Sequence, residues 1–435
     1  MYGLPVAEPA SRWTRLKAWR AQRFTTCFWV VAILPSTYNA ILAAINAQGI
    51  STPRSLAVVA EAGILALCLV ACVLTGGRKH DMGPILLIFF ASIQMTLTSL
   101  LFETIYPDFF RNMAIIAAFT AVGYRSSPDS VRLVFRYISL IVFVFLLIEL
   151  IYLPAYVSIF QPALYLQASR GIEEFSLNET GLFANALGFK DRFSFGIFSG
   201  PRTSSIFLEQ VSLPGFASVL LIFLLGNWTH IGRFDRSLHT VLIVLIILSN
   251  NSRTSSALLA INALGYFIYP YFSGRLTAAI MPFCLAMAFI LVGPVTDALG
   301  SDDILGRLSI TVAHLMNLSV ADFLMGSQGM VARSYDSGYV YLIVSSSIWG
   351  LLAFWAYVTF VPADRTAEQR RVHWGLAVYA YLWMMIGGTA IFTMKTAALL
   401  WLVVGNMVFA SGGSDGNRPI GGRRWESRRQ KYEGS

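Results

Sequence analysis

Two copies of the tetrapeptide Arg-Thr-Ser-Ser, beginning at Arg202 and at Arg253, stand where a polar stretch meets a long apolar run. A guanidinium group presents a planar fork of N–H donors that suits the oxygens of a phosphate or a carboxylate. One interpretation is that both arginines anchor the ends of membrane helices and keep their charged heads in water. The other interpretation is that they hold an anionic group just outside the membrane.

Three further charged residues lie in comparable places. Glu209 follows Arg202 by seven residues, which puts both on one face of a helix; a carboxylate in an apolar run either serves a function or pairs with a neighbouring arginine. Arg307 opens the run "RLSITVAHLMNL", whose apolar spacing predicts a surface helix with His314 at the same edge. Otherwise, Arg307 is a solvated charge on a loop helix. Asp336 precedes another apolar run, where it either does chemistry or caps the helix.

The composition indicates which elements must position these groups. The chain has 435 residues, of which 56% are hydrophobic and 13% charged, and its mean hydropathy is +0.63. Soluble domains carry about 25% charged residues, so the chain is predicted to be an all-α polytopic membrane protein. Its four cysteines lie inside apolar runs and are expected to be packing residues.

The apolar runs predict about twelve transmembrane helices. The shortest is 237–250, and 237–273 read as one long helix is the alternative that would remove a crossing. The predicted spans are 24–47, 55–75, 82–102, 108–124, 133–154, 206–226, 237–250, 254–273, 276–296, 338–360, 373–391 and 394–410.

The distribution of arginine and lysine predicts the orientation. With the amino terminus inside, short basic loops and both basic tails, 1–23 and 411–435, fall on the cytoplasmic side, as the positive-inside rule requires. The amino-terminal tail is expected to lie on anionic membrane lipids and the carboxy-terminal tail to be disordered. Residues 24–410 then form a single transmembrane domain with two long outer loops, about 155–205 and 297–337.

This topology places the charged candidates together on the outer side, at the ends of the sixth, eighth and tenth spans. Arginine forks there suit a diphosphate, and a nearby carboxylate can take a proton from a hydroxyl group. Arg333 and Tyr339 lie in the same segment as Asp336, although Tyr339 and Tyr341 are also typical of the aromatic belt at a membrane surface.

Several chemistries lack their sequence signals. The chain has no GxxxxGK[ST] loop for ATP and no GxSxG nucleophile motif. Its histidines and carboxylates do not gather at the spacing of metal ligands, so neither a metal nor another cofactor is expected. Basic tails beside membrane spans indicate lipid contact and no nucleic acid.

The order of motifs from Gly200 to Gly350 resembles the superfamily of Wzy-type polysaccharide polymerases and O-antigen ligases. "RTSSIFLEQ" is similar to the R-x-S-x-F/L segment that opens one span of that family, and "SNNSRTSS" to its S-x-SR-[ST] segment. "GRLSITVAHLMNLSVADFLMGSQG" resembles the family's surface helix with its Gly-rich turn, and "YDSGYVYLIVSSSIWG" its next span. The flanking spans match only in hydropathy.

The resemblance implies a GT-C-like polymerase/ligase architecture and assigns roles to residues. Arg202, Arg253 and Arg307 fall where the family binds the lipid diphosphate. Asp336 falls where the ligase branch has a histidine general base, which favours the polymerase branch and leaves the base open between Asp336 and Glu209. Arg170 matches, with Gly181, an R-x10-G spacing of some polymerase outer loops, a spacing that also arises easily by chance.

The implied activity is a metal-independent glycosyl transfer at the periplasmic face of a bacterial inner membrane. A growing exopolysaccharide, for example of the xanthan type, would leave its undecaprenyl diphosphate and join a new lipid-linked repeat unit. A flippase and chain-length-determining or export proteins would be its partners. The alternatives are an O-antigen ligase and, in another class, a flippase or transporter, which needs charges along a path through both leaflets.

Overall fold

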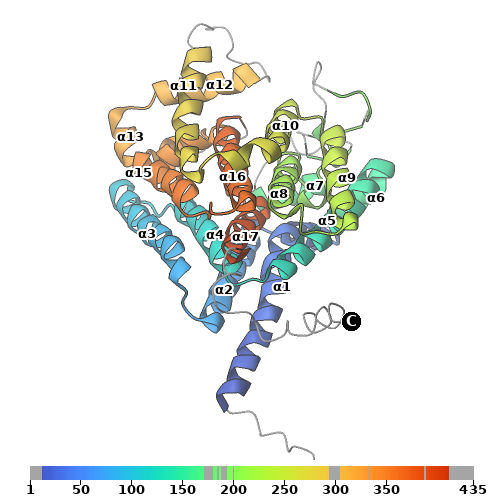
Figure 1. Cartoon of the computed structure of the whole chain (residues 1–435). Helices are drawn as coiled ribbons and strands as arrows, with labels where there is room; N and C mark the ends of the chain where they lie inside the picture. The colour runs from blue at the N-terminus through green and yellow to red at the C-terminus, as the bar shows by residue number, and fades with distance from the viewer. Residues whose placement is uncertain are drawn as a thin grey trace, which may run out of the picture.

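The computed structural model describes residues 12–170, 180–183, 186–187, 194–198, 200–292, 304–331, 333–386 and 388–410. All regular secondary structure in these ranges is helical (Figure 1). Six of the described helices are long and apolar enough to cross a membrane, namely Gln22–Ala47, Arg54–Thr75, Lys79–Phe102, Pro128–Ile151, Gly274–Val292 and Gly338–Phe360. The chain is therefore an α-helical polytopic membrane protein.

Each of the twelve predicted spans corresponds to a helix. Twelve crossings stay a prediction, because several of these helices are short or carry charges in their first turns. The helices are α1 Arg12–Ala47, α2 Arg54–Thr75, α3 Met82–Phe102, α4 Asp108–Gly123, α5 Pro128–Ile151, α8 Ser212–Asn227, α9 Arg233–Asn250, α10 Arg253–Ile268, α11 Ile280–Val292, α15 Gly338–Phe360, α16 Ala367–Ile386 and α17 Met394–Ala410.

Two boundaries decide between the alternatives left by the sequence. Asn251 adopts the left-handed conformation at φ 51° and ends α9, and the Ser252 hydroxyl then accepts a hydrogen bond from the Ser255 N–H at the start of α10. Residues 237–273 are therefore two helices. The sixth predicted span begins at Ser212 instead of residue 206, so the prediction that Arg202 and Glu209 share one helix face is wrong.

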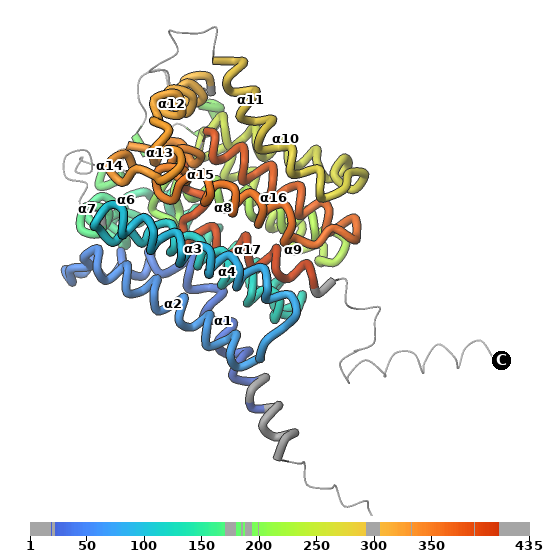
Figure 2. Tube along the Cα trace, turned by 90° about the vertical axis from the view of Figure 1, so that its left-hand side faces the viewer, coloured from blue at the N-terminus to red at the C-terminus, as the bar shows by residue number. Residues whose placement is uncertain are grey.

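Short helices and turns connect the long ones. The expected helix after residue 300 is confirmed as α12, where Leu308 and Val312 are buried and Met316 is exposed, and its place on a membrane surface stays a prediction. Figure 2 shows α6, α7, α12, α13 and α14 gathered at one end of the bundle. These connecting elements are η1 Lys79–Asp81, α6 Leu153–Phe160, α7 Pro162–Arg170, η3 Ser205–Phe207, η4 Tyr269–Tyr271, η5 Gly274–Ala279, α12 Ile304–Met316, α13 Val320–Met325, α14 Gln328–Val331 and η6 Gly388–Phe392.

The basic loops are linked to one another at the other end of the bundle. Arg125, after α4, binds Asp81, before α3, with Nη1 at 2.6 Å from Oδ1. Arg136 near the start of α5 makes a bidentate pair with Asp235 of α9, with both N···O distances at 2.6 Å. These pairs join the start of α3 to the end of α4 and the start of α5 to the start of α9.

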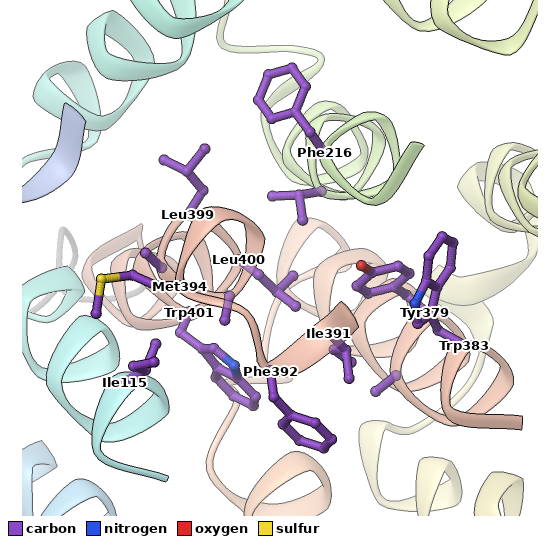
Figure 3. Close-up of a cluster of buried hydrophobic side chains, with 14 of the residues drawn as sticks. Ile115, Phe216, Tyr379, Trp383, Ile391, Phe392, Met394, Leu399, Leu400 and Trp401 are labelled. Atoms are coloured by element: carbon purple, nitrogen blue, oxygen red, sulfur yellow. The ribbon is translucent and has the colours of Figure 1, made fainter. Parts of the chain in front are cut away.

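Helix α17 lies at the centre of the core. Gly123 of α4 and Gly405 of α17 allow the two backbones to touch: a Cβ atom at Gly405 would lie 2.2 Å from the Thr120 carbonyl oxygen. Figure 3 shows Ile391, Phe392 and Trp401, from η6 and α17, among the buried side chains. The connection from α16 to α17 is therefore held rigidly by apolar packing.

Helix α15 is broken at its middle. Ser347 has φ 75° and ψ 173°, which interrupts the helical hydrogen bonds. The Ser327 N–H, from the turn before α14, donates to the Val344 carbonyl at 2.7 Å, and Gln94 of α3 donates to the Ser347 hydroxyl at 3.1 Å. Backbone groups at such a break are satisfied by neighbouring polar groups in place of the helix itself.

Candidate functional site

The first Arg-Thr-Ser-Ser copy lies in a buried, non-helical segment, residues 202–210, that enters the core ahead of α8. Ser205, the first residue of the short 3₁₀ turn η3, has φ 48°, and Leu208, directly after the turn, has φ 62°. Non-glycine residues adopt positive φ at a cost in free energy, so the surroundings must hold this conformation.

Glu149, at the end of α5, holds the centre of this segment. Its side chain is buried, and its carboxylate accepts hydrogen bonds from the Ser204 N–H at 3.0 Å, the Ser205 N–H at 2.7 Å and the Ser204 hydroxyl at 3.2 Å. The Tyr156 hydroxyl of α6 donates to the Ser205 carbonyl at 2.7 Å. Glu149 thus supplies the acceptors that a strained backbone turn lacks within itself.

The end of α9 joins the two Arg-Thr-Ser-Ser copies. The Asn250 amide donates to the carbonyl oxygens of Thr203 and Gln210, each at 2.8 Å. Arg202 donates through Nη2 to the Asn251 carbonyl at 2.9 Å. Arg253 follows Asn251 by two residues, in the first turn of α10, and its side chain is exposed. The structure therefore brings the first arginine beside the helix start that carries the second.

A buried lysine closes the other side of this segment. Lys395, at the start of α17, is 4% exposed, and its Nζ lies 2.9 Å from the Phe207 carbonyl oxygen and 3.3 Å from Oε1 of Glu209. Oε2 of Glu209 accepts from the Ser212 hydroxyl at 3.0 Å. Among the described residues, the printed ion pair of Glu209 is thus with a lysine from a distant part of the chain.

Arg307 and Asp336 both lie beside the connection between α16 and α17. Arg307 donates through Nη1 to the Ile386 carbonyl at 3.2 Å. Asp336 is exposed, and the Tyr335 carbonyl next to it accepts from the Thr389 N–H at 3.1 Å. Ser337 caps α15 by accepting from the Val340 N–H, so the interpretation of Asp336 as the cap is wrong.

The accessory candidates predicted from the sequence lie in different surroundings. His314 is half-buried in α12, seven residues from Arg307, and Arg333 is exposed in the turn before α15. Tyr339 is fully buried and donates to the Tyr381 carbonyl at 3.0 Å, so neither an interfacial nor an accessory position fits it. Tyr341 is buried as well. Arg170 is the last residue of α7, and its side chain lies outside the described residues.

The candidate site thus consists of two clusters joined by α16 and its connection to α17. One contains Arg202, Glu209, Lys395 and the start of α10; the other contains Arg307 and Asp336. In the described ranges, no three His, Cys, Asp or Glu side chains lie close enough to hold a metal ion. The available chemistry is cationic stabilisation with carboxylate proton transfer.

Two important residues, Glu149 and Lys395, were not among the candidates predicted from the sequence. The sequence does contain a signal for both residues, because each is the one ionisable residue of an apolar run, "FLLIELIYL" for Glu149 and "FTMKTAALL" for Lys395. An ionisable residue inside a membrane span is a functional candidate by default.

Comparison of the chain with protein-family models, with curated proteins and with solved structures gave no match.

Proposed function

We propose that the protein is a polysaccharide polymerase of the Wzy type, which joins undecaprenyl-diphosphate-linked repeat units at the periplasmic face of a bacterial inner membrane. The observation that carries this proposal is the contact of Arg202 with Asn251, which brings together the two Arg-Thr-Ser-Ser copies. A diphosphate presents oxygens on two phosphorus atoms, and two guanidinium groups at neighbouring backbone positions suit such a ligand.

The proposed step is a displacement at the anomeric carbon of the growing glycan. The hydroxyl oxygen of the acceptor repeat unit attacks that carbon, the bond to the diphosphate oxygen breaks, and the diphosphate leaves with the bonding electrons. Arg202, Arg253 and Arg307 stabilise the charge that develops on the leaving group. The hydroxyl proton passes to a carboxylate.

Asp336 is the better of the two candidate bases. It is exposed and so accessible to an acceptor hydroxyl, whereas Glu209 is paired with the buried Lys395 and with Ser212. We assign Glu209 and Lys395 a positioning role, because Lys395 holds the segment that carries Arg202 through Glu209 and the Phe207 carbonyl. The proposed topology has both termini in the cytoplasm, with a flippase supplying substrate and chain-length-determining and export proteins receiving the product.

The direct test is reconstitution of the full chain in liposomes with purified lipid-linked repeat units. We expect ladders of elongated glycan on gels, with equal yield in the presence of a chelator, and loss of the ladder for Asp336→Asn. Persistence of elongation in Asp336→Asn would transfer the role of base to another group. Loss of elongation on chelation would contradict the metal-independent reaction.

The break in α15 supports a second candidate, a flippase for the same lipid-linked units. Discontinuous helices are common at the substrate sites of transporters. A flippase variant at Arg253 or Arg307 would accumulate repeat units on the inner leaflet, whereas a polymerase variant would export single units without joining them. Labelling of the sugars on the outer leaflet distinguishes these outcomes. The ligase alternative would yield glycan on a lipid or protein acceptor in place of longer chains.

A further inference from the structure

Two arginines stacked on aromatic rings form a continuous row at the end of the bundle opposite the candidate site. The Arg236 guanidinium lies 5.4 Å from the ring centroid of Trp228, and Arg371 lies 4.1 Å from that of Tyr266. Trp228 and Tyr266 meet edge to face at 6.4 Å. We call these four residues the cation–aromatic ladder. Arg236 belongs to α9, Arg371 to α16 and Tyr266 to α10, and Trp228 directly follows α8.

In the part of the chain that the structure describes, the ladder holds positive charge without acidic partners. No ion pair joins Arg236 or Arg371 to a carboxylate among the described residues, and the nearest acidic residue along α9, Asp235, is bound to Arg136. The buried Nε of Arg236 has no hydrogen-bond partner in the described structure. Arg371 donates through Nε to the Tyr266 carbonyl at 2.9 Å, which fixes the plane of its guanidinium over the ring.

An apolar surface continues from the ladder along α10. Ile261, Leu264, Phe267 and Ile268 are all exposed on this helix, between 46% and 71%. Tyr266 of the ladder stacks edge to face on Phe267, with centroids 5.3 Å apart. A ligand that fits both features carries an anionic group at one end and a hydrocarbon chain at the other.

We propose that the cation–aromatic ladder binds the phosphate headgroup of an anionic phospholipid, with an acyl chain along the exposed face of α10. The two rings hold the guanidinium planes apart and desolvate one side of each, which strengthens their attraction for phosphate oxygens. The acyl chain distinguishes this ligand from free phosphate. The proposal is independent of the polymerase activity.

The test uses the full chain in nanodiscs of equal parts phosphatidylglycerol and phosphatidylcholine, with native mass spectrometry of the lipids retained on release. We expect preferential retention of phosphatidylglycerol, and at least a tenfold loss of that preference in the double variant Arg236→Gln/Arg371→Gln. The matched control is Arg233→Gln/Arg365→Gln, which removes the same charge from two exposed arginines, at the start of α9 and just before α16. The control is expected to keep the preference.

Three outcomes overturn the proposal. Equal loss in the control pair means that the preference follows net charge. Equal retention of both lipids in the unchanged protein means that no headgroup is selected. Displacement of the lipid by millimolar inorganic phosphate means that the site takes free phosphate. Should the double variant fail to fold, Arg236→Lys/Arg371→Lys replaces it in the test. This variant keeps the charge and is expected to retain a weaker preference for phosphatidylglycerol.

Discussion

Helices α9 and α16 each have an arginine contact at both ends, and the contacts at the two ends differ in kind. At the candidate site, Arg202 and Arg307 donate to carbonyl oxygens of Asn251 and Ile386. At the cation–aromatic ladder, Arg236 and Arg371 lie on aromatic rings, and Arg371 also donates to the Tyr266 carbonyl beneath it. Carbonyl contacts fix both the position and the direction of a guanidinium, whereas a ring fixes chiefly its plane. The first arrangement suits a reaction, and the second suits a mobile lipid headgroup.

The candidate site and the ladder also differ in buried charge. The candidate site has Glu149 and the Glu209–Lys395 pair inside the core, whereas the ladder has no carboxylate bound to its arginines among the described residues. Buried ion pairs are poor sources of stability but are costly to break. The candidate site should therefore be sensitive to single charge deletions, and the ladder should tolerate them. The following predictions test that difference, from the largest expected effect to the smallest.

The largest effect is expected from Lys395→Met, which leaves the Glu209 carboxylate without its cation. Removing one partner of a buried pair costs about 3–5 kcal/mol, measured as the free energy of unfolding in detergent micelles. Adding Glu209→Gln should restore much of that loss without restoring elongation. As a control, Asp129→Asn breaks the surface pair with Arg132 and should cost less than about 1 kcal/mol. Equal effects of the buried and surface variants would remove the distinction.

Next in size is Arg253→Ala, which removes one cation from the proposed diphosphate site and leaves an exposed position with little packing to lose. Deleting one group that stabilises developing charge lowers a rate by about 10²–10³-fold. Elongation rate at saturating lipid-linked substrate is the measurement, and an unchanged melting temperature shows that the fold is kept. Arg233→Ala, at the start of α9, is the matched control and should elongate normally. A normal rate in Arg253→Ala would remove this residue from the reaction.

A smaller effect is expected from Glu149→Gln. Oε2 of Glu149 accepts from both the Ser204 and the Ser205 N–H groups, so an amide oxygen at that place keeps both bonds. The N–H₂ group then takes the place of Oε1, where it faces the Ser204 N–H donor at 3.1 Å instead of accepting from it. Replacing a buried acceptor by a donor in this way costs about 1–3 kcal/mol of folding free energy. Elongation should fall together with stability, because Arg202 is part of the displaced segment. Glu103→Gln, at an exposed turn, should change neither quantity.

The helices and the segment that carries Arg202 also differ in how well the sequence predicts them. Apolar runs located a helix at each of the twelve predicted spans, because burial and lipid contact keep such an element apolar along its length. The predicted start of α8 was wrong. The residues before Ser212 are apolar enough to continue a helix, but contacts with Glu149, Asn250 and Lys395 hold them in a turn. Such long-range partners have no local sequence signal beyond the isolated charges themselves.

The smallest effect, and the sharpest contrast, is expected from the same substitution made at each end. Arg371→Lys keeps the charge beside Tyr266 and loses only ring stacking and the Nε contact, worth about 0.5–1 kcal/mol, so the preference for anionic lipid should weaken slightly. Arg307→Lys replaces a fork of donors with a single ammonium group that cannot both hold the Ile386 carbonyl in the same geometry and grip a diphosphate. Elongation should then fall much more than lipid preference does. Lysine tolerated equally at both ends would mean that charge alone matters at position 307, and the carbonyl contact would lose its proposed role in directing the guanidinium.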